Sequence, residues 1–198
     1  DSGLAEQHAQ KLAKEQAIIY CSPYNDPQVI AGQGTIALEL LQQLPKLDVV
    51  YVSIGGGGLI SGIGAVLKAF SPSTRLVGVS ARNSAELAAS IRAGHSVQVT
   101  HSDTLADGCA GGVDQGSITL PLCREVIDEL IDCTEDEIAE GIRHMAWSEK
   151  MLVEGSAGLA QAAWQADAPK RTNKVSAVVL CGANFDRDRI APIIGSMP

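Results

Sequence analysis

The 198-residue sequence carries a formal net charge of −8 and is 45% hydrophobic. The negative charge argues against nucleic acids and anionic membrane surfaces as partners, and no apolar run approaches the roughly 20 residues that a membrane span needs. The five cysteines show neither a C-x-x-C pair nor zinc-type spacing. This usage predicts reduced thiols and a cytoplasmic location.

The first part of the chain is expected to form a helix, a strand and an interrupted helix. Apolar residues at helical spacing predict the first helix over residues 4–16, and the apolar run at residues 17–21 predicts a short strand. Asp26 followed by Pro27 is typical of a helix start, with aspartate as the N-cap and proline in the first turn. We expect that second helix to be interrupted around residues 32–34, where two glycines occur.

A strand, a glycine run and a helix start form the most informative stretch of the sequence. Residues 49–54 are an apolar, β-branched run of the kind found in strands buried on both faces of a parallel sheet. The run ends in four consecutive glycines, Gly55, Gly56, Gly57 and Gly58. Helical spacing then begins at Leu59, and a helix N-terminus with bare backbone attracts anions. The stretch predicts a phosphate site, and a glycine-rich turn without a ligand is the alternative.

The phosphate compound predicted for this site is small. The dinucleotide pattern G-x-G-x-x-G fails in every register of the glycine run, and no G-x-x-x-x-G-K-[ST] occurs. The next expected strand, residues 76–80, brings no acid for a ribose hydroxyl, and only Arg82 would suit a ribose phosphate. A nucleotide-phosphate binder that uses Arg82 is therefore the weaker reading.

The remainder of the chain alternates helices with strands. Helices are expected over residues 83–93, 120–130, 134–147 and 156–164 and after residue 187, and extended segments over residues 131–133 and 175–180. This alternation indicates a single α/β domain over residues 1–198, with a doubly wound parallel sheet and helices on both faces. Ligands bind beyond the carboxyl ends of such strands. We therefore expect the glycine run and residues 181–184, which follow the last strand, to face one crevice.

Five motifs occur in order along nearly the whole chain. They are VIAGQGTIALELL at 29–41, SIGGGGLISGI at 53–63, TLADG at 104–108, VEGSAG at 153–158 and LCGANFD at 180–186. Together they resemble the pyridoxal-phosphate-dependent serine/threonine dehydratases and serine racemases, which have the tryptophan-synthase-β fold. The resemblance implies a lyase that uses pyridoxal 5'-phosphate to convert serine, threonine or a related β-hydroxy amino acid to a 2-oxo acid and ammonia. A non-catalytic remnant of the fold, acting as a phosphate-binding or interaction module, is the alternative.

The resemblance also implies a set of cofactor-binding residues. The four glycines and the Leu59 amide would hold the cofactor phosphate, and the Gly108 backbone would lie beside the cofactor ring. Cys181 stands where the family places a serine or cysteine against the pyridine nitrogen, with a buried core thiol as the alternative. Asn184 matches a family asparagine. Glu154 matches a family acid near the cofactor, with a plain helix-capping role as the alternative.

Two departures from the family pattern bear on what the chain does alone. In the family, the Schiff-base lysine of the S-x-K motif and the asparagine-bearing loop for the substrate carboxylate lie far upstream of the region that this chain resembles. We therefore expect the C-terminal part of the large domain without the small domain, no catalytic residue in this chain, and a homo-oligomer or association with the missing N-terminal segment. Ser80 stands where metal-binding members carry an acid, and Glu86 nearby does not complete a ligand set, so no metal site is expected.

Overall fold

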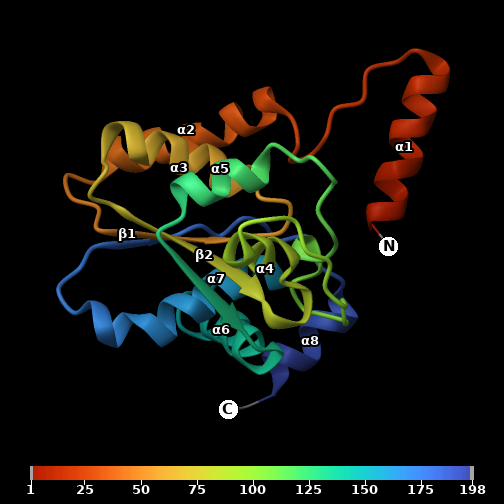
Figure 1. The fold of residues 1–198 in the computed structure, drawn as a ribbon. Coiled ribbons are helices and arrows are strands. Elements are labelled where there is room, and N and C mark those ends of the chain that lie inside the picture. Colours follow the sequence, from red (N-terminus) through yellow and green to blue (C-terminus); the bar gives the residue numbers. More distant parts are fainter. Residues whose placement is uncertain (1, 197–198) are drawn as a thin grey trace.

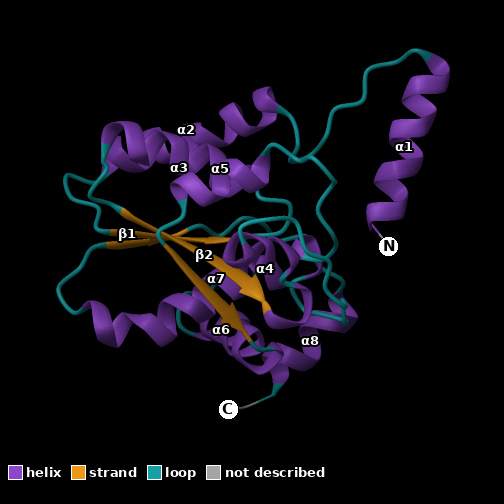
Figure 2. Cartoon of the chain, viewed as in Figure 1, coloured by secondary structure: helices purple, strands orange, loops and turns teal. Residues whose placement is uncertain are grey.

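The computed structural model describes residues 2–196, without the side chains of residues 2 and 4. Its centre is a parallel sheet in the order β3-β2-β1-β4 (Figures 1 and 2). The strands are β1 (Val49–Ser53), β2 (Arg75–Ala81), β3 (Glu129–Cys133) and β4 (Ser176–Val178). From β1 the chain adds β2 and β3 on one side and then returns to place β4 on the other side of β1. The predicted α/β fold with a parallel sheet is confirmed.

Helices cover both faces of the sheet (Figure 1). One face carries α2 (Pro27–Gln43), α3 (Gly58–Phe70), α4 (Glu86–Ala93) and α5 (Thr119–Val126); the other carries α6 (Glu135–Trp147), α7 (Gly155–Asp167) and α8 (Arg187–Gly195). Three short 3-10 helices, η1 (Arg82–Ser84), η2 (Asp107–Cys109) and η3 (Ala168–Arg171), lie in the connections. Among the described helices, none is long and apolar enough to cross a membrane.

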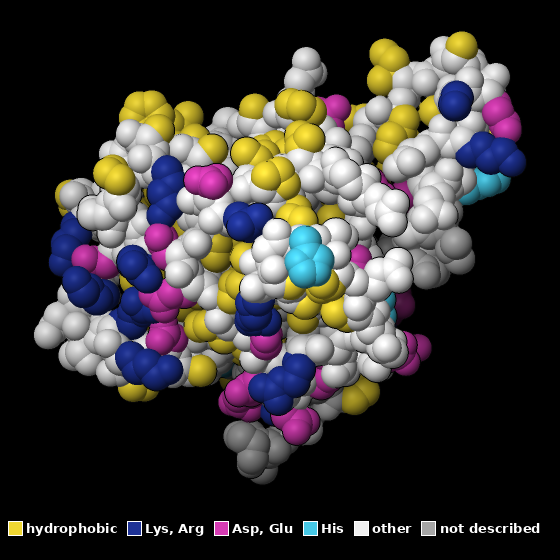
Figure 3. Space-filling model, in the orientation of Figure 1, with side chains coloured by type: hydrophobic (Ala, Val, Ile, Leu, Met, Phe, Trp, Pro, Cys, Tyr) yellow, Lys and Arg dark blue, Asp and Glu magenta, His cyan; other side chains and the backbone are white. Residues whose placement is uncertain are grey.

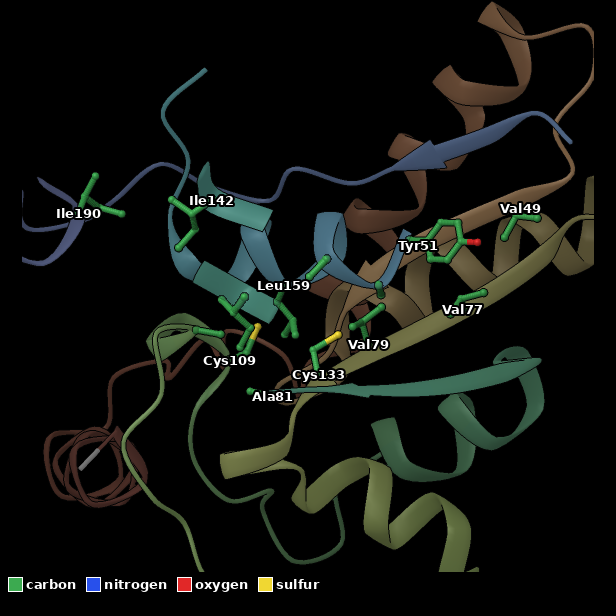
Figure 4. Close-up of a cluster of buried hydrophobic side chains, with 14 residues drawn as sticks. Val49, Tyr51, Val77, Val79, Ala81, Cys109, Cys133, Ile142, Leu159 and Ile190 are labelled. Carbon is green, nitrogen blue, oxygen red and sulfur yellow. The ribbon is translucent and has the colours of Figure 1, made fainter. Parts of the chain in front are cut away.

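The two core clusters follow the alternation of side chains along the strands. Val50 and Val52 of β1 pack with the α2–α5 layer, whereas Val49 and Tyr51 pack with the α6–α8 layer. Figure 4 shows this second cluster, in which Val79 of β2 lies closer to Leu159 of α7 than Val49 of β1 does. Such strands, buried on both faces, explain the continuous apolar run at residues 49–54. On the surface, acidic and basic side chains are interspersed over the face in Figure 3.

The strand predicted for residues 17–21 is wrong. This segment is an irregular connection between α1 (Ser2–Gln16) and α2, and Figure 1 shows α1 standing apart from the sheet. Ile18 and Ile19 are 59% and 96% exposed. A segment with high β-propensity forms a strand only when it pairs with another strand. None of the described strands pairs with residues 17–21.

The predicted interruption of the second helix is also wrong, because α2 is continuous from Pro27 to Gln43. The absence of a side chain at Gly34 lets α2 pack closely against α3. A Cβ added at Gly34 would lie 3.1 Å from the Gly62 carbonyl oxygen of α3, and one added at Gly62 would lie 2.1 Å from the Ile30 carbonyl oxygen. The start of α2 is as predicted, since the Asp26 carboxylate accepts the Gln28 amide at 2.8 Å.

Several helix and strand ends also differ from those expected. The helix expected over residues 120–130 ends at Val126, and the chain then enters β3 at Glu129. The helix expected over residues 156–164 runs further, to Asp167. The Thr134–Glu137 capping box is present at the start of α6.

Candidate functional site

A cavity of about 440 Å³ lies where the order of strands reverses, at the carboxyl ends of β1 and β4. Ser53 ends β1, and its Oγ lies 3.3 Å from Sγ of Cys181, which follows β4. The crevice expected between the two strand ends is therefore formed. This is the position at which ligands bind to doubly wound sheets.

The glycine run forms one wall of the cavity. Gly57 caps α3 with φ +87°, in the left-handed region that favours glycine. Within the described part of the chain, the backbone N–H groups of residues 55–59 donate to no acceptor. They lie at the N-terminus of α3, where the helix dipole adds positive potential. This wall therefore presents unused donors suited to an anion such as phosphate.

The opposite wall is built from the η2 turn, the start of α7 and the loop after β4. Glu154 is the N-cap residue of α7, and its carbonyl accepts the Gly158 amide at 3.0 Å, but its side chain makes no capping hydrogen bond. Its Oε2 instead accepts the Asn184 amide at 2.8 Å, and its own amide donates to the Gly182 carbonyl at 3.2 Å. Glu154 therefore occupies the helix-capping position of the alternative, while its carboxylate makes its hydrogen bond to the loop after β4. The carboxylate holds the loop after Cys181 against the cavity.

Gly108 contributes a surface without a side chain on this wall. A Cβ at this position would lie 2.9 Å from Ser156 Oγ and 3.2 Å from Glu154 Oε1. The Ser156 hydroxyl is buried and has no hydrogen-bond partner among the described residues. A polar atom left unpaired beside a cavity marks a place where a ligand or water can complete the hydrogen bonding.

The thiols in the cavity are neutral groups. Burial raises the pKa of Cys109 to about 11, and burial also raises the pKa of Cys181. Both side chains are therefore protonated at neutral pH and present weak S–H donors. All five cysteines of the chain are free.

The charged residues that line the cavity are Glu6, Asp107 and Glu154, and its described lining contains no lysine or arginine. Attraction for an anion therefore comes from backbone N–H groups and the α3 dipole. Arg82 lies outside the lining, so nothing in the cavity supports the nucleotide-phosphate reading. The described residues also contain no cluster of three or more His, Cys, Asp or Glu side chains that would hold a metal ion.

Eight of the nine residues expected at the site line this one cavity: Gly55, Gly56, Gly57, Gly58, Leu59, Gly108, Glu154 and Cys181. Asn184 lies outside the lining and is exposed, and only its backbone contacts Glu154. Sequence reasoning missed Tyr24, Ser53 and Ser156. Ser53 could have been predicted from the sequence, because it is the last residue of a strand at a ligand-binding edge. Ser156 could have been predicted because it belongs to the VEGSAG motif. Tyr24 lies in a distant loop and gave no such signal.

The comparisons with known proteins agree with this geometry. Residues 1–182 match the family "Pyridoxal-phosphate dependent enzyme". The chain is 37% identical to the L-threonine ammonia-lyase of Thermotoga maritima over 96% of this chain and 47% of that protein. The chain thus spans about half the length of the curated relatives that it matches.

Solved structures give the same result. The processed threonine deaminase isoform 2 of Solanum lycopersicum superposes with a TM-score of 0.88 at 31% identity, covering 96% of this chain and 55% of that one. The serine racemase of Dictyostelium discoideum has a TM-score of 0.80 at 31% identity, covering 91% and 58% of the two chains. Because the family match extends over residues 1–182 of 198, this chain belongs to the pyridoxal-phosphate-dependent enzymes.

Proposed function

We propose that the cavity between β1 and β4 binds pyridoxal 5'-phosphate, and that the chain is part of a lyase acting on serine, threonine or a related β-hydroxy amino acid. The observation that carries this proposal is the row of unused N–H donors at residues 55–59, at the N-terminus of α3. A phosphate dianion fits that row because the amides and the helix dipole supply the positive potential that the side chains do not.

The other end of the cavity suits the ring of the cofactor. Cys181 offers a neutral S–H donor, and Gly108, which has no side chain, lines the same cavity. Glu154 fixes the loop that follows Cys181 through the Asn184 amide. When bound, the cofactor supplies an electron-withdrawing ring, and the protein supplies its anchoring and orientation.

The substrate-handling groups are proposed to come from outside this chain. Among the described residues, none of those that line the cavity is a lysine, and the threonine ammonia-lyase relative is about twice as long as the matched region. A lysine amine is the group expected to bond the cofactor aldehyde and to take the Cα proton. We propose that the segment present in the relatives supplies it, so that the isolated chain is a single α/β domain that binds cofactor without turning substrate over.

The phosphate site is tested by equilibrium binding of inorganic phosphate and pyridoxal 5'-phosphate to the 198-residue chain. Gly57→Ala should weaken both by at least tenfold, because a Cβ there requires an unfavourable φ of +87° and would lie 2.6 Å from Leu87 Cδ2. Gly116→Ala is the matched control. Gly116 also has positive φ, +74°, but open space around it and no place in the cavity lining.

The control variant should lose some stability and keep parental binding of both ligands. Equal affinities of the parent and Gly57→Ala would place the phosphate elsewhere. The alternative is a phosphate-binding module without enzymatic action. One observation favours it, which is that no lysine is among the described residues that line the cavity. It predicts that adding the segment found in the relatives produces no visible-light absorbance from a covalently bound cofactor.

A further inference from the structure

The aromatic side chain of Tyr24 lies against the glycine run. A Cβ added at Gly56 would lie 2.3 Å from Tyr24 Cγ and 2.6 Å from both Cδ atoms. The space in front of Gly56 is thus filled by this ring. The missing side chain at Gly56 is required by a residue of the same chain, whether or not a ligand approaches there.

Tyr24 also joins the glycine run to a third segment. Its hydroxyl oxygen accepts the Asp114 amide at 3.0 Å. The next residue repeats the connection, since Asn25 Oδ1 accepts the Ile118 amide at 3.0 Å. Residues 22–26 are therefore fastened to the loop before α5 on one side and to the glycine run on the other.

Tyr24 lines the 440 Å³ cavity together with the glycines. It also lines a neighbouring cavity of about 860 Å³, between α1 and the loops that contain residues 22–26 and 112–115. Tyr24 therefore lies where the two cavities adjoin.

We infer that Tyr24 is a positioning residue, whose ring holds the backbone of the glycine run in the conformation that aims its N–H groups at a phosphate. The inference rests on the proposed function. Residues 55–57 lie between a strand and a helix and are all glycines, whose backbone has wide conformational freedom. A fixed wall removes that freedom before the ligand binds, and preorganisation of this kind raises affinity.

The test is a double-mutant cycle between residues 24 and 56, with binding of inorganic phosphate as the readout. Tyr24→Ala should weaken phosphate binding about tenfold, and Gly56→Ala should weaken it by at least as much, because the new methyl group displaces the ring or the backbone. In the double variant the Tyr24 ring is absent, so the methyl group of the new alanine at residue 56 has room. The two losses should therefore not multiply, and the double variant should bind no more weakly than Gly56→Ala.

Gly58 provides a matched control for the cycle. A Cβ there would lie 2.7 Å from Tyr24 Cα and 2.9 Å from the Tyr24 carbonyl oxygen, which are backbone atoms. Tyr24→Ala leaves both atoms in place. Gly58→Ala should therefore be as harmful in the Tyr24→Ala background as in the parent. Tyr24→Phe, which keeps the ring and loses only the contact with Asp114, should stay within threefold of parental affinity.

The outcomes separate this inference from the proposed function. If the parent binds neither inorganic phosphate nor pyridoxal 5'-phosphate, the proposed function fails and the inference fails with it. If the parent binds and the losses at 24 and 56 multiply, or Tyr24→Ala binds as tightly as the parent, the inference alone fails. Circular dichroism establishes that each variant is folded. Should Tyr24→Ala not fold, Tyr24→Ser replaces it in the cycle with the same expected results.

Discussion

At the scale of single residues, two buried serines differ in whether their hydroxyl groups have hydrogen-bond partners. Ser156 Oγ has none, whereas Ser84 Oγ accepts the Gly111 amide at 3.1 Å and lies 2.8 Å from His101 Nδ1. Removing an unsatisfied hydroxyl is neutral or favourable, but removing a satisfied one leaves its partners unpaired. Ser156→Ala should leave the unfolding free energy of the ligand-free protein unchanged or raise it by up to about 1 kcal/mol.

The matched variant is Ser84→Ala, which should lower the unfolding free energy by about 1–3 kcal/mol. Urea denaturation followed by circular dichroism measures both. A loss of stability in Ser156→Ala as large as that in Ser84→Ala would show that the Ser156 hydroxyl is satisfied within the protein. It would then no longer support a ligand beside Gly108.

At the scale of elements, the contact between α2 and α3 depends on glycine at one position and not at another. A Cβ at Gly62 would lie 2.1 Å from the Ile30 carbonyl oxygen, so Gly62→Ala must separate the two helices. It should destabilise the protein by about 1–3 kcal/mol or more. Gly32, in the same helix as Ile30, has nothing within 4 Å of its would-be Cβ. Gly32→Ala should raise stability by about 0.4–1 kcal/mol. Thermal unfolding checks both, and equal shifts in Tm would contradict this account.

A second prediction at this scale concerns the polar network that joins β1, α7 and β3. Tyr51 donates to Asp167 Oδ2 at 2.8 Å, Arg171 Nε donates to the same oxygen at 2.6 Å, and Arg171 also pairs with Glu129. Burial acts to raise the pKa of Asp167, but the hydrogen bonds from Arg171 and Tyr51 outweigh it and lower the pKa. The folded carboxyl therefore stabilises the protein above its unfolded pKa of about 4, and this stabilisation is lost as the pH falls through the folded value.

The expected result is an unfolding free energy that falls more steeply below about pH 4 in the parent than in Asp167→Asn. Asp103→Asn, a change at an exposed aspartate, should keep the parental slope. The measurement is urea denaturation at a series of pH values. Identical slopes for the parent and Asp167→Asn would remove Asp167 from the groups that govern acid stability.

The sequence was sufficient where local pattern and buried environment agree. The strand at residues 49–54 and the glycine run followed from β-branched residues and from the absence of side chains at a helix start. The boundaries around residues 126–129 did not follow, because an apolar run fits a buried helix or a buried strand equally well. The contact of Tyr24 with Gly56 could not be predicted from the sequence, because it joins residues whose proximity depends on the tertiary fold.

At the scale of the whole molecule, we expect the chain to bind the cofactor without turning over an amino acid substrate. The purified 198-residue chain with added pyridoxal 5'-phosphate should release neither ammonia nor a 2-oxo acid from L-serine or L-threonine, because no lysine lines the cavity in the part of the chain that the structure describes. Supplying the N-terminal segment of a relative, fused or as a second chain, should be necessary for turnover. Turnover by the chain alone, lost when one of its own lysines is replaced, would contradict the prediction and identify the base.

Association is the other prediction for the whole molecule. β4 is an outer strand of the described sheet, and beside it lies a hollow of about 620 Å³ lined partly by Met151, Trp164 and Leu180. An unpaired strand edge next to apolar surface favours pairing with another chain. Sedimentation should show a dimer or larger species. A monomer over a wide concentration range would refute this.

The return of the chain to β1 has a consequence for biosynthesis. Ser53 and Cys181, which face each other at 3.3 Å, are separated by 128 positions, and β4 is the last of the four strands to leave the ribosome. β1, β2 and β3 have their partners available earlier, so a nascent chain can assemble most of the sheet while the cavity still lacks one wall. Contacts between such distant positions form slowly. We therefore expect a ligand to bind in this cavity only after β4 and the loop that follows it have joined the sheet.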